Sequence, residues 1–223
     1  MSFLSRNKVY QRNAPTKDAK KIYIFCEGER NEINYFSYFI EISSKIDIIP
    51  IPCEKGQSDP EKLKKLPMRK KEEGTLEIDT KLEDQVWFVI DTDRWNEKDK
   101  INILKQYVYD QNQVLNTTIY FVAQSNPSFE IWQYFHFYSE KPEINKVKKC
   151  NNFKEFASAK IIGGFDNRKH PVEIETACSN AETNFESEND QPALFSTELF
   201  RLAKEILKFA KPILDQHFIK TEK

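Results

Sequence analysis

Three carboxylates stand directly after two apolar runs of the sequence. Glu27 follows the run KIYIFC at residues 21–26, and Asp91 and Asp93 follow the run VWFVI at residues 86–90. Short apolar runs rich in β-branched and aromatic residues are typical of buried strands. An extended backbone puts both aspartates on one side, because side chains alternate along a strand with a period of two.

This set of residue types predicts a divalent metal site. In open parallel sheets, sites form beyond the carboxyl ends of the strands, so neighbouring strands would bring Glu27 to Asp91 and Asp93. Hard carboxylate oxygens favour Mg²⁺ or Mn²⁺, and such an ion polarises a phosphoryl oxygen and activates water. Gly28 lets the backbone approach closely beside Glu27. Taken singly, each acid would be an ordinary turn or cap residue, but the three together favour phosphoryl chemistry.

The elements that must position these carboxylates alternate along the first half of the chain. The expected order is a strand at 21–26, a helix at about 31–44, a strand at 46–51, a helix at about 60–71, a strand at 86–90, a helix at about 98–113 and a strand at 118–123. Such alternation predicts a parallel α/β sheet flanked by helices.

The pattern changes after residue 126. We expect an aromatic-rich helix over 127–138 and a long amphipathic helix over 194–209, which Pro212 should kink or end. The expected organisation is a basic N-terminal arm at 1–20, an α/β domain at 21–125 and a helical extension at 126–223 packed on the same domain.

Composition limits the classes of protein. With 39% hydrophobic and 31% charged residues, the chain can bury a core and is not disordered over most of its length. It has no apolar run of membrane-spanning length and no signal-like start, so we expect a cytoplasmic protein with no membrane contact. Its four cysteines lack metal-ligand spacing, which favours reduced thiols. Without a Walker or GxGxxG pattern, nucleotide hydrolysis must come from a partner.

Charge is distributed unevenly although the net charge is only −1. Basic residues are concentrated in the first 21 residues and again between residues 141 and 154, whereas residues 172–198 hold seven carboxylates and no Lys or Arg. The second basic cluster consists of Lys141, Lys146, Lys148, Lys149 and Lys154. These stretches are either solvated surface or two phosphate-binding patches separated from an acidic partner surface.

Two groups of motifs carry a family resemblance. Residues 24–29 (IFCEGE) and 89–93 (VIDTD) resemble the two Toprim signatures, a glutamate after the first strand and a DxD after the third. More narrowly, residues 26–36 (CEGERNEINYF) resemble the opening of the RloB-like family. Residues 125–132 (SNPSFEIW), followed by the His-Phe pair at 136–137, resemble the second signature of that family.

The resemblance implies a Toprim fold, metal-dependent phosphodiester cleavage and work beside an ATPase in bacterial anti-phage defence or restriction. It makes Glu27 the general acid/base, with a share in metal binding, and makes Asp91 and Asp93 the holders of Mg²⁺ or Mn²⁺. Ile33 departs from the family pattern, which usually has proline there. The chain after residue 140 matches only loosely, so the substrate stays open between RNA, including tRNA, and DNA.

Four further residues are candidates for supporting roles. Glu130 and His136 are six positions apart on the expected helix, about 600° of rotation, so they do not share a face. Through the resemblance both are candidate catalytic residues, while helix-dipole stabilisation by Glu130 and packing of His136 are the alternatives. Arg30 and Arg94 flank the acidic loops and would contact a substrate phosphate or pair with nearby carboxylates.

Two other functions remain open. A DxD after a strand also begins a class of phosphatases in which Asp91 would be the nucleophile, although that mechanism leaves Glu27 without a role. A non-enzymatic adaptor or regulatory subunit of the ATPase complex would use the charged 54–84 and 172–198 segments as contact surfaces. The sequence indicates no oligomeric state.

Overall fold

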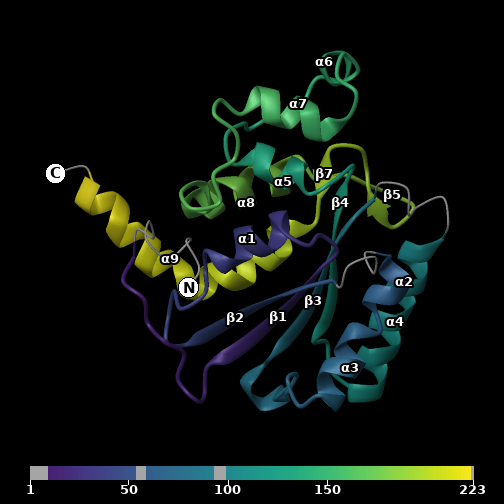
Figure 1. The fold of residues 1–223 in the computed structure, drawn as a ribbon, viewed down its shortest axis with the longest axis vertical. Coiled ribbons are helices and arrows are strands. Elements are labelled where there is room, and N and C mark those ends of the chain that lie inside the picture. The colour runs from purple at the N-terminus through teal and green to yellow at the C-terminus, as the bar shows by residue number, and fades with distance from the viewer. Residues whose placement is uncertain (1–9, 54–58, 93–98, 222–223) are drawn as a thin grey trace. The chain divides into compact units, whose positions relative to one another are not determined.

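The computed structural model describes residues 10–53, 59–92 and 99–221 (Figure 1). These residues form two compact units. The first contains the described residues between 11 and 90 and between 99 and 122. The second contains Tyr10, Asp91, Thr92 and residues 123–221. The strands β3 and β4 each begin in the first unit and end in the second.

The expected mixed α/β fold, a mostly parallel sheet flanked by helices, is confirmed. The five-stranded sheet has the order β2-β1-β3-β4-β7. Its strands are β1 (Lys20–Cys26), β2 (Ile46–Pro52), β3 (Gln85–Asp91), β4 (Tyr120–Asn126) and β7 (Ser196–Thr197). β1 is parallel to β2 and to β3, whereas β7 pairs with β4 in the antiparallel direction. The first four strands are those expected from the apolar runs, and β7 was not foreseen.

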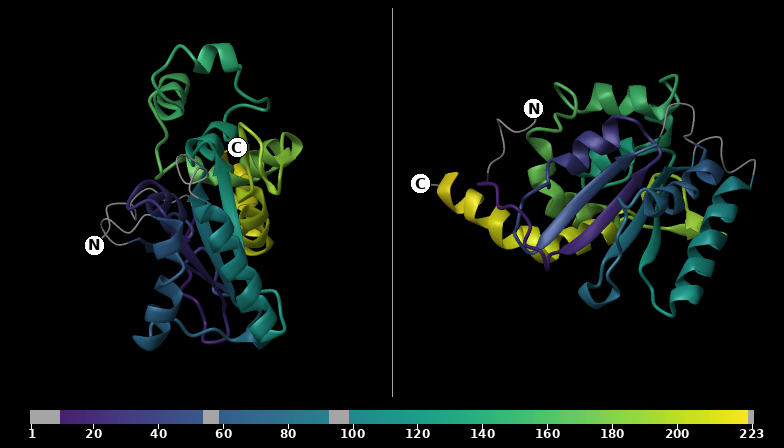
Figure 2. Two further views of the ribbon diagram at one scale, coloured as in Figure 1. Left: turned by 90° about the vertical axis from the view of Figure 1, so that its right-hand side faces the viewer. Right: turned by 60° about the horizontal axis from the view of Figure 1, so that its bottom comes forward.

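Helices of the first unit cover its strands. They are α1 (Asn31–Ser37), α2 (Pro60–Leu63), α3 (Leu66–Glu72), the 3₁₀ helix η2 (Thr80–Leu82) and α4 (Lys100–Leu115). Figure 2 shows α2, α3 and α4 beside the sheet. Their buried Leu63, Leu66 and Leu104 share one core with Phe25 and Phe88 from the strands. Phe25 and Phe88 are parallel-displaced neighbours on β1 and β3, with ring centres 5.6 Å apart.

Three expected helices are shorter or divided in the structure, among them the one expected at 127–138, which spans only Glu130–Phe135. α1 ends at Ser37, and the chain continues to Ile42 through tight turns that keep Phe39 and Ile42 buried. Apolar residues at helical spacing therefore continue in the sequence after the helix has ended, which is why the helix was expected to be longer. The helix expected at 60–71 is divided into α2 and α3, because Pro67 has no N–H to continue the hydrogen-bond ladder.

The second unit is mainly helical. It contains α5 (Glu130–Phe135), α6 (Ile144–Val147), α7 (Phe153–Lys160), the 3₁₀ helix η4 (His170–Glu173), α8 (Ile174–Thr183), a small hairpin of β5 (Ser187–Glu188) and β6 (Gln191–Pro192), and α9 (Leu199–Thr221). α9 starts later than expected because Leu194 and Phe195 lie in a turn and Ser196–Thr197 form β7. It also continues through Pro212, so the proline does not end the helix.

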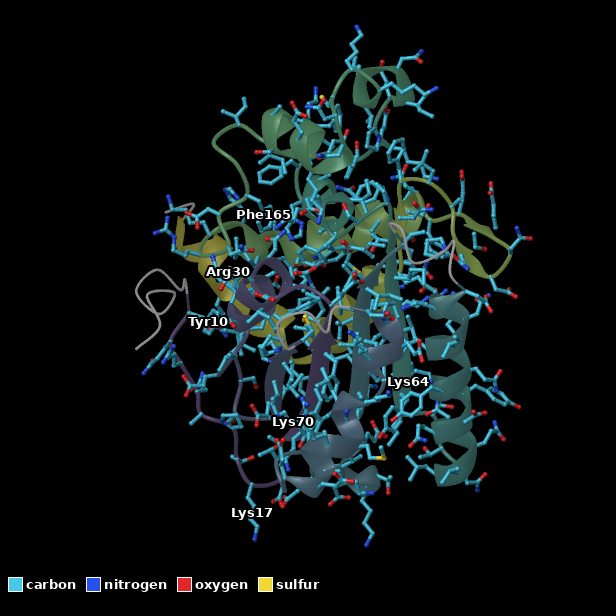
Figure 3. The ribbon with its side chains drawn as sticks, turned by 45° about the vertical axis from the view of Figure 1, so that its right-hand side comes forward. Tyr10, Lys17, Arg30, Lys64, Lys70 and Phe165 are labelled. Atoms are coloured by element: carbon cyan, nitrogen blue, oxygen red, sulfur yellow. The ribbon has the colours of Figure 1, made fainter. Side chains whose placement is uncertain are left out.

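Figure 3 shows Lys64 and Lys70 with the α2 and α3 segments of the first unit. Among the described residues, no helix is both long enough and apolar enough to cross a bilayer.

Candidate active site

Asp91, the last residue of β3, has a fixed carboxylate. Its side chain is buried, and Oδ1 accepts a 2.7 Å hydrogen bond from the backbone N–H of Phe129. Oδ2 lies 3.9 Å from the ammonium group of Lys154 on α7. One oxygen is therefore anchored by the backbone just before α5, while the other faces a cation.

Glu130, the first residue of α5, meets the same lysine. Its Oε2 accepts a 2.7 Å hydrogen bond from the hydroxyl of Ser128 and lies 4.0 Å from Nζ of Lys154. The lysine side chain as a whole is 58% exposed. The second unit thus gathers Asp91, Glu130 and Lys154 from β3, α5 and α7.

The backbone after Asp91 is held by the neighbouring strand β4. Thr92 donates to the carbonyl of Ser125 through both its N–H and its hydroxyl, at 2.8 and 2.9 Å. The amide of Gln124, fully buried, donates to the same hydroxyl at 2.9 Å. These bonds fix the start of the DxD segment. Asp93 and Arg94 lie outside the described residues.

Glu27 belongs to the first unit, where its backbone is held on two sides. Its N–H donates to the carbonyl of Val89 at 3.0 Å, and its carbonyl accepts a 2.7 Å hydrogen bond from the thiol of Cys53. β1 and β3 are paired in parallel up to Cys26 and Val89. Glu27 therefore leaves β1 beside Val89 of β3 and is half-buried.

Gly28 is required by close packing rather than by an unusual backbone. A Cβ built at this position would lie 1.9 Å from Oε2 of Glu32, which is buried in the first turn of α1. The glycine therefore makes room for the Glu32 carboxylate directly after Glu27. Arg30 precedes α1 and is exposed, as Figure 3 shows.

The end of β1 carries a negative field. Burial, reinforced by the carboxylates of Glu29, Glu27 and Glu32, raises the pKa of the Cys53 thiol to about 11. The thiol is therefore protonated at neutral pH and is able to donate its hydrogen bond to Glu27. All four cysteines are free.

His136 lies in an aromatic cluster. Its ring meets Trp132 and Phe165 edge-on, at centroid distances of 5.3 and 5.0 Å. Nδ1 lies 2.9 Å from the carbonyl of Trp132, and because a carbonyl only accepts, Nδ1 carries the proton. Burial lowers the pKa of His136 to about 3, so the imidazole is neutral at neutral pH. This environment resembles a packing site more than an acid/base site.

The donor chemistry at the strand ends fits a hard cation, since Asp91, Asp93 and Glu27 would offer only carboxylate oxygens. Across the residues that the structure describes, no three histidine, cysteine, aspartate or glutamate side chains form a metal-binding group.

Lys154 is the residue that sequence reasoning did not identify individually. The sequence placed it in a basic cluster, and no spacing relates it to Asp91 or Glu130. Only the packing of α7 beside α5 brings its ammonium to the two carboxylates.

Comparison with known proteins identifies the family. No curated protein and no solved structure matches the chain. Residues 22–206 match the family described as RloB-like protein, and this range includes the signatures at 26–36 and 125–132. Because the match spans most of the sequence, the chain belongs to the RloB-like protein family.

Proposed function

We propose that this RloB-like protein is a metal-dependent nuclease of the Toprim type that cleaves phosphodiester bonds in RNA, tRNA included, or in DNA. The observation that carries the proposal is the anchored carboxylate of Asp91. It sits at the end of a buried strand, with one oxygen bonded to the Phe129 N–H and the other directed to Lys154. A carboxylate oriented in this way is suited to a cation or to a reacting phosphate.

Asp91 and Asp93, with a share from Glu27, are the residues that would hold Mg²⁺ or Mn²⁺. When bound, the ion supplies charge stabilisation for the phosphoryl oxygens. Asp91 contributes an orientation that is already fixed before binding, because Phe129 and Thr92 anchor its side chain and the following backbone. Pre-organisation of this kind lowers the cost of reaching the reactive geometry.

Glu27 acts as the general base in this proposal. The oxygen of water forms a bond to phosphorus, Glu27 takes the water proton, and the bond to the leaving sugar oxygen breaks. That oxygen then takes up a proton from solvent. The ammonium of Lys154, a residue whose side chain is 58% exposed beside Asp91 and Glu130, binds a non-bridging phosphate oxygen of the substrate.

An ATPase partner and a role as the effector of bacterial anti-phage defence or restriction form the wider part of the proposal. Membership of the RloB-like family supports this context. The chain has no Walker motif, so energy from nucleotide hydrolysis has to be supplied by a second protein. Co-purification of the protein with an ATPase expressed alongside it is the direct test of the partnership.

The decisive experiment measures cleavage of RNA and DNA by purified protein, alone and with the ATPase, in Mg²⁺ and in EDTA. Wild-type protein should cleave only with the metal, and Asp91→Asn protein should lose cleavage. Lys208→Gln, which changes an exposed lysine on α9, is the control. If Asp91→Asn protein cleaves as fast as wild type, the site is wrongly assigned. Calorimetric Mg²⁺ binding that requires Asp91 would separate an enzyme from an adaptor.

A further inference from the structure

A cavity of about 210 Å³ lies between α5, α6 and α7 in the second unit. Its walls combine aromatic rings with lysines and with the carboxylates of Glu140 and Glu143. The lining residues that could contact a ligand's rings and anionic groups are Tyr134, Tyr138, Phe156, Lys141, Lys146 and Lys160. The cavity is separate from the Asp91, Glu130 and Lys154 group, none of which lines it.

The aromatic wall is rigid. Tyr134 and Tyr138 stack with ring centres 4.5 Å apart and an interplanar angle of 23°. Phe156 supports Tyr134 from α7 at 6.3 Å, and both side chains are buried. The Tyr138 hydroxyl donates to the backbone carbonyl of Lys160 at 2.8 Å, which fixes this partly exposed ring. A flat, fixed ring at a cavity wall is a platform for another flat group.

Three lysines, Lys141, Lys146 and Lys160, supply the positive charge of the cavity. The ammonium of Lys160 lies 5.5 Å from the centre of the Tyr138 ring. Lys146 pairs with Glu143, and Lys141 pairs with Glu186, which is 72% exposed. The side chain of Lys141 is itself only 22% exposed. The Lys146–Glu143 pair is exposed on both sides and contributes at most about 1 kcal/mol, so a phosphate can replace Glu143 there.

Two helices connect the cavity to the candidate active site. Tyr134 stands four residues after Glu130 on α5, and residues four apart lie on the same face of a helix. On α7, Lys154 and Lys160 are six residues apart, which corresponds to about 9 Å along the axis but to about 600° of rotation, so they are related by axial spacing and not by a shared face.

We propose that this cavity is a nucleotide-binding subsite for single-stranded nucleic acid. A base lies against Tyr138, where the Lys160 ammonium now sits, and Lys160 turns on its flexible side chain towards the adjoining phosphate. Lys141 and Lys146 neutralise the same backbone. The inference rests on the proposed nuclease function and names the form of its substrate.

The chemistry selects a single strand over a duplex. Bases in a duplex are stacked on their neighbours, and their faces are not accessible to a tyrosine. An unpaired segment exposes the faces of its bases, and aromatic side chains bind such bases with little sequence preference.

The test measures binding without cleavage. Fluorescein-labelled oligo(U) and oligo(dT) of roughly ten nucleotides, and a hairpin duplex, are titrated with protein in EDTA and followed by anisotropy at several salt concentrations. The Lys146→Gln/Lys160→Gln variant should bind the single strands about tenfold more weakly at low salt. Its plot of log K against log salt should lose about 1.4 units of slope, because each lost phosphate contact removes about 0.7 on single strands.

Matched variants separate charge from stacking. Lys208→Gln removes an exposed lysine that, like Lys146, pairs with a glutamate three residues earlier, and it should bind as wild type does. Tyr138→Leu should weaken binding of oligo(U) but not of an abasic oligomer, whereas Tyr138→Leu affecting both equally would exclude base stacking. Near-ultraviolet circular dichroism checks that each variant is folded.

The outcome that overturns the subsite is equal affinity and equal salt slope for wild type and Lys146→Gln/Lys160→Gln. Preferred binding of the duplex would overturn it as well. Because binding is measured in EDTA, failure of the subsite differs from failure of the nuclease. If wild-type protein binds through these lysines but does not cleave in Mg²⁺, the subsite proposal is supported and the nuclease proposal is contradicted.

Discussion

The backbone N–H of Phe129 donates a 2.7 Å hydrogen bond to Oδ1 of Asp91. Both groups are buried, and they join the end of β3 to the start of α5. The acid proposed to hold the metal is thus also part of the framework of the second unit. Different substitutions of Asp91 can therefore separate its contribution to catalysis from its contribution to stability.

Asp91→Asn and Asp91→Ala should differ in stability but not in activity. Asparagine keeps an oxygen that accepts the Phe129 N–H, whereas alanine leaves that donor buried without its partner. We expect alanine to lower the free energy of unfolding by about 1–3 kcal/mol relative to asparagine. Both variants should lose cleavage by at least about a hundredfold. Urea unfolding and cleavage rates measure the two effects, and equal stability of the two variants would contradict the structural role.

Lys154→Gln should slow cleavage while leaving the fold intact. The lysine is 58% exposed, so its removal costs little stability, but the substrate phosphate loses a cation beside Asp91 and Glu130. The expected loss is about tenfold to a hundredfold, with partial recovery in Lys154→Arg. Lys208→Gln serves as the exposed control. Wild-type rates for Lys154→Gln would remove the lysine from the proposed mechanism.

Gly28→Ala should destabilise the first unit through Glu32. The added methyl group would meet the Glu32 carboxylate at 1.9 Å, so this buried side chain must move. We expect a loss of about 1–3 kcal/mol in the free energy of unfolding. The double variant Gly28→Ala/Glu32→Ala should be less destabilised than the sum of the two single variants, because the clash is absent. Strict additivity in thermal or urea unfolding would show that the packing argument is incorrect.

Stability should fall as pH decreases below about 6.5. Burial lowers the pKa of His136 to about 3, so the folded state keeps this imidazole neutral while the unfolded chain binds a proton below its ordinary pKa of 6.5. Unfolding is then favoured by acid, by up to about 1.4 kcal/mol per pH unit between pH 6.5 and about 3.

His136→Gln should flatten this pH dependence. Burial also lowers the pKa of His170, which adds a smaller slope of the same sign that should remain in the variant. Urea unfolding at several pH values provides the measurement. An unchanged slope in the variant would mean that His136 is not the responsible group.

The primary sequence by itself determined the strands and the acids that follow them. β1 and β3 are continuous apolar runs, and Glu27 and Asp91 stand at their ends because strand and turn preferences are local properties of a few residues. The same local signals overextended the helix at 31–44, since Phe39 and Ile42 stay buried in turns after α1 has ended.

Only the tertiary structure decided what surrounds these acids. The contacts of Lys154 with Asp91 and Glu130 join segments far apart in sequence, and no local pattern encodes such a meeting. The neutral state of His136 likewise depends on burial between Trp132 and Phe165. Burial and ion pairing depend on residues that are close in space but distant in sequence. They are therefore established only when α5 and α7 pack together.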